Sequence, residues 1–494
     1  MGARAGAGNA AALNRPAASP GEGKARFLSA LARRAFAPVD IASLACFRVA
    51  FGAVMAWEVV RYFQNRWIAS YYIEPEFHFT YYGFGWVGPW PGAGMYVHFA
   101  MLGLAAIGIM IGVSYRLSAV VFFLGFTYVF LLDQARYLNH FYLIALLSFL
   151  LVFLPVRGVL SLDARRRPEL RSDTAPAWGL WLLRAQVGIP YFYAGLAKLN
   201  GDWLRGEPLR AWLADRTDFP LLGRYFTEEW IVFAFAYGGL LLDLLIVPLL
   251  IWRRSRPWAF GAGVLFHGLN ALLFHIGVFP WLMMAATTIF FAPDWPRRLR
   301  LLPPRRLPDP SIEPSPPRAR AMLAAVAAYL VLQVTIPLRH FAYPGNVSWT
   351  EEGHRFSWHM KLRDKDASAR FLVADPAQGR SWTVKPSNHL TRLQSSKMAA
   401  QPDMILQFAH HLAGRLRRAG HHRVEVRAWV TASLNGREPQ PLIDPTVNLA
   451  AQPRGVRPAT WILPLRQPLP PRTKGLAGAP LRHRRPGTPD AAEE

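Results

Sequence analysis

Cysteine and acidic residues are both scarce in this chain of 494 residues. Cys46 is the only cysteine, which excludes a disulfide-stapled secreted scaffold. Charged residues make up 18% of the chain, below the usual quarter, and 56 Lys and Arg outnumber 31 Asp and Glu. The heptad and Gly-X-Y periods are absent as well, so a coiled coil or a collagen is excluded.

Several motifs of soluble enzymes are missing. There is no His-Glu-x-x-His pattern and no cluster of cysteines, so we expect no metal site. No Walker loop, dinucleotide-binding fingerprint or Gly-x-Ser-x-Gly elbow occurs. The first residues contain no apolar stretch typical of a signal peptide.

Long apolar runs dominate the first two thirds of the chain. Apolar residues reach 52% overall and aromatics 13%, and several runs are long enough to cross a bilayer. The fold class is therefore predicted to be mainly α, with a polytopic bundle of about nine transmembrane helices. The nine segments are residues 45–62, 94–113, 117–132, 138–156, 178–196, 230–252, 258–274, 277–291 and 322–337.

The excess of basic residues gives a formal net charge of +25. In a soluble protein this charge would favour nucleic acid as a partner. Here the arginines form short clusters between apolar runs, as at 165–167, 253–254 and 297–306, which is typical of cytoplasmic membrane loops. We therefore expect a multi-pass cell-membrane protein with a cytoplasmic N-terminus, an extracytoplasmic C-terminal domain and no nucleic-acid partner.

The composition divides the chain into four parts. Residues 1–40 are predicted to be a disordered basic tail, 41–338 the transmembrane helical domain, 339–466 a small α+β domain, and 467–494 a second disordered basic tail. Within the α+β domain we expect an Asn435-Gly436 hairpin turn. The other expected elements are strands at 355–362, 370–374 and 423–433, and an amphipathic helix at 403–418.

Ionisable residues at membrane depth are costly and are functional candidates for that reason. Lys198 lies at the external end of the fifth segment, after aromatic and apolar neighbours. Burial disfavours the charged form of an amine, so Lys198 could act as a base. The alternative is a lysine that extends its amine to the membrane interface from a helix end.

Two more pairs belong to the same external side. Asn139 and His140 open the fourth segment, where they could exchange a proton and donate to a developing negative charge, or could simply cap the helix. His267 and Asn270 share one face of the seventh segment, with His275 at its end. Their alternative is an interhelical hydrogen bond.

Ten aromatic residues crowd the first external loop. They form either an aromatic belt at the membrane interface or a wall for a flat ring such as a quinone. They are Trp67, Tyr71, Tyr72, Phe77, Phe79, Tyr81, Tyr82, Phe84, Trp86 and Trp90.

At these residues the sequence resembles the vitamin K-dependent gamma-carboxylase family and its bacterial relatives. The resemblance is strongest over residues 191–203, which read YFYAGLAKLNGDW. It covers about 400 residues in order, also at 47–52, 128–133, 139–140, 266–267, 270, 273–274, 276–279, 293–299, 349–350, 356–360, 444–445 and 447.

The resemblance implies an enzyme, a carbon–carbon lyase, in the transmembrane domain. In the family a lysine deprotonates reduced vitamin K, which reacts with O2, and the resulting strong base removes a γ-hydrogen from glutamate. The carbanion then adds CO2, and the vitamin leaves as its epoxide. The expected cofactor is a menaquinol- or phylloquinol-type hydroquinone, O2 and CO2 are co-substrates, and the partners are a Glu-containing peptide and the lipid bilayer.

The family's base falls on Lys198 and its important histidine on His140. By the same resemblance, Asn139, Tyr191, His267 and Asn270 are expected to contact the quinone. Animal members have two adjacent lysines where this chain has Ala197-Lys198, and they continue well beyond the position of Leu465. Two alternatives therefore stay open, a quinol epoxidase that carboxylates no protein and a non-catalytic membrane module with this fold.

Overall fold

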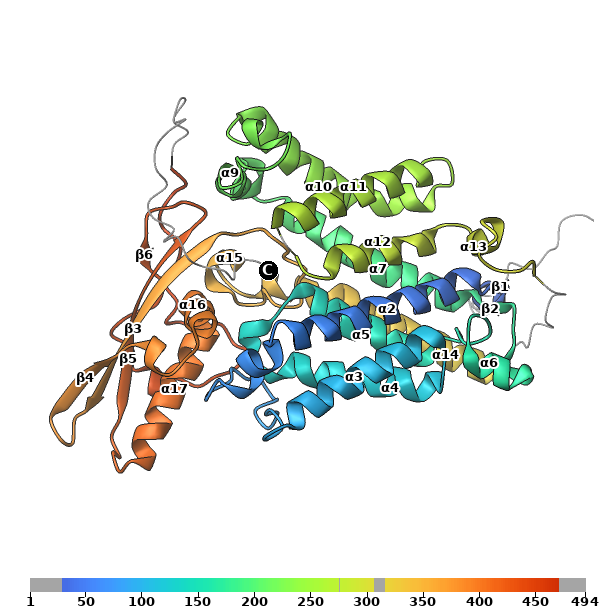
Figure 1. Cartoon of the computed structure of the whole chain (residues 1–494). Helices are drawn as coiled ribbons and strands as arrows, with labels where there is room; N and C mark the ends of the chain where they lie inside the picture. Colours follow the sequence, from blue (N-terminus) through green and yellow to red (C-terminus); the bar gives the residue numbers. More distant parts are fainter. Residues whose placement is uncertain (1–28, 275, 306–315, 471–494) are drawn as a thin grey trace, which may run out of the picture.

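The computed structural model describes residues 29–274, 276–305 and 316–470 (Figure 1). The outer parts of both predicted tails, and His275, lie outside the described residues.

All nine predicted apolar segments are helical, which confirms the mainly α fold class. They are α2 (Ala42–Gln64), α3 (Gly94–Ile111), α4 (Tyr115–Leu132), α5 (Asn139–Phe153), α7 (Ala177–Lys198), α10 (Glu229–Ile251), α11 (Arg256–Phe274), α12 (Phe279–Thr287) and α14 (Pro316–Leu338). Six of them are long and apolar enough to cross a membrane, whereas α5, α7 and α12 are not among these six. The structure therefore supports a membrane bundle with fewer clear spans than the nine expected.

Close packing in the bundle depends on a small residue where α2 crosses α3. A Cβ atom at Gly52 would lie 2.6 Å from the backbone nitrogen of Met110 and 2.7 Å from the carbonyl oxygen of Ala106. No side chain fits at that distance, so glycine lets the two backbones meet directly. The same contact region holds Arg48, which is fully buried and donates to the carbonyls of Met110 at 2.9 Å and Leu160 at 2.6 Å.

The end of the bundle that carries the basic loops is closed by short elements. Strands β1 (Pro38–Asp40) and β2 (Thr174–Pro176) pair there in antiparallel fashion. Arg297 joins them, with its Nε 2.9 Å from Asp40 Oδ2 and its Nη2 2.6 Å from Asp173 Oδ1. This end also holds α6 (Leu162–Arg166) and α13 (Trp295–Arg298), and it lies opposite the C-terminal domain (Figure 1).

The remaining short elements connect the long helices. They are η1 (Ala69–Ile73), η2 (Gln134–Arg136), η3 (Pro168–Leu170), α8 (Gly201–Leu204), α9 (Leu209–Ala214), η4 (Gly223–Tyr225), η5 (Thr288–Phe290), η6 (Arg339–Ala342), α15 (Val347–Thr350), η7 (Pro386–Asn388) and η8 (Leu449–Ala451).

The C-terminal domain is a four-stranded antiparallel sheet with two helices packed on it. The strand order is β4 (Arg380–Val384), β3 (Lys365–Asp375), β5 (Glu425–Leu434) and β6 (Gln440–Pro441). Helices α16 (Arg392–Ala400) and α17 (Pro402–Arg418) lie between β4 and β5 in the chain. Alternate residues of β5 are buried, and α17 packs Met404, Phe408 and Leu412 into the same core. The predicted helix, the hairpin turn and two of the three predicted strands are confirmed.

The predicted strand at 355–362 is wrong. Phe356 and Trp358 have positive φ angles of 65° and 58°, which no strand adopts. Their rings pack on Tyr142, each with a centroid distance of 4.9 Å. The alternating pattern therefore reflects a twisted segment that packs against the start of α5.

A buried carboxylate fastens the domain to the bundle. Asp133, after α4, is 2% exposed and accepts hydrogen bonds from the Ala135 amide and the Gln394 side chain, both at 2.8 Å. Because Gln394 lies on α16, this contact fixes the domain over the external end of the helices.

Candidate active site

Lys198 is the last residue of α7, and its side chain is only 7% exposed. Its Nζ atom lies 2.6 Å from Asp243 Oδ2 and 3.5 Å from the carbonyl oxygen of Ala194. The ring of Trp203 is 5.1 Å away. The amine therefore points into the protein, and the alternative that it extends to the membrane interface is wrong.

Asp243 was not singled out from the sequence. It lies near the middle of α10, is 4% exposed and comes from a helix 45 positions further along the chain. An acid inside an apolar run of membrane length is itself a signal, because such residues are rare and costly there. The sequence pattern could have identified Asp243 as a candidate, but only the packing of α10 on α7 identifies its partner.

The buried pair has a definite chemical capacity. The direct ion pair compensates each charged group for the water that it loses on burial. Removing one member would leave the other charge buried and unpaired, which is strongly unfavourable. Lys198 and Asp243 thus form an ion pair that is shielded from water.

A second buried pair joins α7 to α11. The Tyr191 hydroxyl lies 2.6 Å from His267 Nε2, and each residue is 2% exposed. The alternative given for His267, an interhelical hydrogen bond, is therefore observed. The Nδ1 atom of His267 is buried and has no hydrogen-bond partner in the part of the chain that the structure describes. Asn270 is half-buried on the same helix and joins neither pair.

His140 and the Tyr191–His267 pair share one aromatic neighbour, Phe279. The Phe279 ring lies 5.8 Å from the ring of His140 and 5.8 Å from that of His267. Asn139 donates to the His359 carbonyl at 3.2 Å and accepts from the Tyr137 hydroxyl at 3.1 Å. The capping alternative for Asn139 is wrong. Asn139 is already the first residue of α5, the N-cap position is Leu138, and no side chain caps the helix there.

A pocket of about 850 Å³ lies between the start of α5 and the C-terminal domain. Asn139 and His140 line it, together with several basic side chains. The basic lining residues are Arg355, Lys361, Arg363 and Lys397. Glu351 is the one acid in the lining, and Arg363 already holds it at 2.8 Å. The pocket is therefore suited to an anionic ligand.

Burial also changes the protonation of groups in this pocket. It lowers the pKa of Lys397 to about 7, helped by the nearby charges of Arg363 and Lys361. The pKa of His359 falls to about 3 because of burial and of the charges of His340, Arg363 and Lys198. Burial and the surrounding positive charge therefore favour the neutral forms of both side chains.

An open groove of about 2,220 Å³ continues outward from the pocket. The two spaces share Gln134, Glu351, Arg355 and Gln401. Tyr81, Tyr82 and Phe84 of the first external loop line the groove. Other rings of that loop face outward, since Trp86 is 79% and Trp90 53% exposed. The ten aromatic residues therefore divide between the groove, the interior and the surface.

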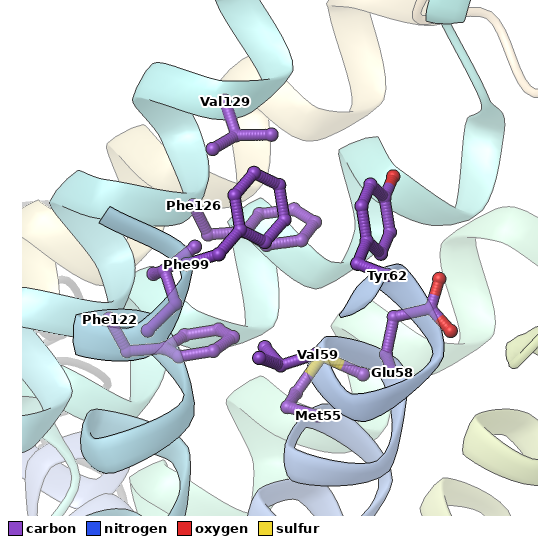
Figure 2. Close-up of a pocket in the computed structure, with 9 residues that line it drawn as sticks. Met55, Glu58, Val59, Tyr62, Phe99, Phe122, Phe126 and Val129 are labelled. Atoms are coloured by element: carbon purple, nitrogen blue, oxygen red, sulfur yellow. The ribbon is translucent and has the colours of Figure 1, made fainter. Parts of the chain in front are cut away.

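A smaller pocket of about 330 Å³ lies apart from these residues, between α2, α3 and α4 (Figure 2). Its lining is aromatic and aliphatic, with the Glu58 carboxylate at one edge, 2.6 Å from Arg61. None of the candidate residues from the sequence lines it.

An apolar helix bundle with paired ionisable groups buried beneath an outer α+β domain defines a polytopic membrane protein with a buried ion pair. A family model described as the HTTM domain matches residues 36–295, more than half of the chain. A second, described as the vitamin K-dependent gamma-carboxylase lumenal domain, matches residues 318–468. The chain therefore belongs to the vitamin K-dependent gamma-carboxylase family.

The family indicates a carboxylase-type enzyme, and the lumenal name of the second match indicates that the C-terminal domain is extracytoplasmic. No solved structure matches the chain significantly.

Proposed function

We propose that the protein is an integral membrane glutamate γ-carboxylase that couples oxygenation of reduced vitamin K to its epoxide with addition of CO2 to glutamate. The observation that carries this proposal is the buried Lys198–Asp243 pair, in a bundle whose His140 and Phe279 side chains line a basic pocket under the outer domain. Reduced vitamin K, with O2, would supply the strong base that removes the γ-hydrogen.

In this proposal the Lys198 amine, in its neutral form, takes the proton from the hydroquinone hydroxyl, and the Asp243 carboxylate then stabilises the resulting ammonium as an ion pair. The amine lies 2.6 Å from the carboxylate and both are buried, so bulk water does not compete for the transferred proton. The apolar helices around α7 also provide the hydrophobic surroundings that a prenyl tail requires.

Four side chains are proposed to hold the quinone ring, those of Tyr191, His267, His140 and Asn139. The unpartnered Nδ1 of His267 fits this role, because a buried ring nitrogen without a partner can bond an oxygen of the ligand. The Phe279 ring between His267 and His140 offers a flat apolar surface beside them. Asn270 joins neither pair and remains the least supported member of the proposed set.

The basic pocket is proposed to bind the glutamate carboxylate. Arg363 and Lys397 supply positive charge, and charge-assisted hydrogen bonds to a carboxylate are among the strongest in proteins. A substrate peptide would enter through the outer groove, which is continuous with the pocket.

The test uses purified protein in detergent with reduced vitamin K, O2, labelled bicarbonate and a Glu-containing peptide. The wild type should form epoxide and labelled peptide, and Lys198→Ala should lose both by at least about 100-fold, since general-base catalysis contributes that much. An added small amine should restore part of the activity. Lys385→Ala, at an exposed lysine, is the matched control and should leave both products unchanged.

The products separate the alternatives. Formation of epoxide without labelled peptide would identify the protein as a quinol epoxidase and contradict the carboxylase proposal. Absence of both products from folded wild-type protein would contradict the enzymatic proposal, as would full activity of Lys198→Ala.

A further inference from the structure

A hairpin of the C-terminal domain grips the loop that follows Lys198. The guanidinium of Arg437 binds the Asp202 carboxylate through two parallel bonds, with Nη1 2.6 Å from Oδ2 and Nη2 2.7 Å from Oδ1. Asn435 donates to the same carboxylate at 2.8 Å. Three charge-assisted bonds on one carboxylate give a directional contact rather than a loose surface ion pair.

The hairpin side of this contact is held firmly. Arg437 is 9% exposed and also donates to the carbonyls of Leu434 and Gln467, both at 3.1 Å. Asn435 is 4% exposed. Its backbone amide donates to the Asp364 carbonyl at 2.8 Å, and its side-chain oxygen accepts from the Asp364 backbone amide at 2.8 Å. Hydrogen bonds to the backbone of the sheet therefore hold Arg437 and Asn435 in place.

The Asp202 carboxylate of this contact stays ionised at neutral pH. Burial would raise the pKa of Asp202, but the hydrogen bonds and charge of Arg437, with the bond from Asn435, hold it below its usual value. The carboxylate therefore keeps its negative charge above about pH 4.

On the loop side, Asp202 is followed by the ring that covers the amine. Asn200 accepts from the backbone amides of Asp202 and Trp203, both at 3.0 Å. Trp203 is 4% exposed, donates to the Ala236 carbonyl of α10 at 2.9 Å, and places its ring 5.1 Å from Lys198 Nζ. A displacement of Asp202 would thus move a wall of the Lys198–Asp243 site.

We propose that Asp202 and Arg437 are positioning residues, through which the C-terminal domain holds Trp203 over the Lys198 amine and keeps water from it. This inference rests on the proposed function for its kinetic part, because there Lys198 is the base. Neither residue touches the reacting atoms, and their effect passes through Trp203. The outer domain then helps to build the buried base in addition to covering the basic pocket.

The variants for the test are Arg437→Lys and Asp202→Asn, which keep size but remove the two-point contact. The matched control is Arg427→Lys, which weakens the exposed pair of Arg427 with Glu425 in the same domain, 2.7 Å apart. Each variant is compared with the wild type as full-length protein in detergent, at equal folded fraction by size-exclusion chromatography.

The first readout is independent of activity. Lys198 labelling by a water-soluble amine reagent is followed by mass spectrometry of the Lys198 peptide. We expect Arg437→Lys and Asp202→Asn to raise the labelling rate about tenfold, because a displaced ring opens the amine to water, and Arg427→Lys to leave it unchanged. Unchanged labelling in both test variants would overturn the inference.

The second readout is the kinetics of quinol consumption. Both test variants should lower kcat about tenfold and shift its pH profile, with less than about twofold change in the KM for quinol. A contact that only stabilises the fold would lower the thermal midpoint and leave kcat and its pH profile as in the wild type, and that result would also overturn the inference.

A double substitution completes the test. Trp203→Leu should reproduce the effect of Arg437→Lys, and the two together should cost no more than either alone, since they act through one ring. Additive losses would contradict a common route. If the wild type consumes no quinol, the proposed function fails, whereas the labelling result still decides the positioning claim.

Discussion

Among single residues, Lys397 shows how the fold changes the chemistry of a common side chain. Its pKa of about 7 arises from burial and from the neighbouring charges of Arg363, Lys361 and Arg136. Below pH 7 the ammonium form dominates in the empty pocket, and above pH 7 the neutral amine does. An anionic ligand prefers the charged form, so binding should favour low pH.

The pH dependence of peptide binding tests this. In the wild type, the Kd of a Glu-containing peptide should rise above pH 7, by up to about tenfold per pH unit. Lys397→Arg keeps a charge at every pH and should abolish the rise. Lys397→Met should bind weakly throughout, whereas Lys385→Met should match the wild type. A rise that persists in Lys397→Arg would assign the titration to another group.

Among the helices, the α2–α3 crossing shows how a contact between elements depends on one missing side chain. Gly52→Ala would place a methyl group 2.6 Å from the backbone of α3, which cannot move as a flexible side chain would. We expect a destabilisation of about 1–3 kcal/mol, as for other overpacked sites, and a lower thermal midpoint by tryptophan fluorescence in detergent.

Gly261 in α11 is the matched control for Gly52. Apart from its chain neighbours and the backbone of its own helix, no described atom lies within 4 Å of a Cβ built at this position, so Gly261→Ala has room. The substitution should leave stability unchanged or raise it by about 0.4–1 kcal/mol. Equal midpoints for the two alanine variants would show that the close approach of α2 and α3 is not needed.

In the whole molecule, the basic loops and the C-terminal domain lie at opposite ends (Figure 1). Strand β1, near the start of the described residues, shares its end with α6 and α13, which carry basic clusters. Positive loops stay in the cytoplasm, so we expect the N-terminus there and the C-terminal domain outside.

Reporter fusions test this orientation in cells. Alkaline phosphatase fused after residue 470 should be active, and green fluorescent protein at the same position should be dark. Fusions in the loop after α10, at Arg254, should give the reverse pattern. Active phosphatase at Arg254 and a dark phosphatase fusion at residue 470 would invert the topology and place the basic pocket in the cytoplasm.

The sequence alone determined the helical class, the position of most helices and the family, because hydropathy runs, charge clusters and motifs are local properties of the chain. It also predicted that Lys198, His140 and His267 lie toward one side of the membrane. Only the tertiary structure decided that Asp243 pairs with Lys198, that Arg437 grips Asp202, and that 355–362 twists instead of forming a strand. These depend on distances between segments far apart in the chain, and periodicity carries no such distances.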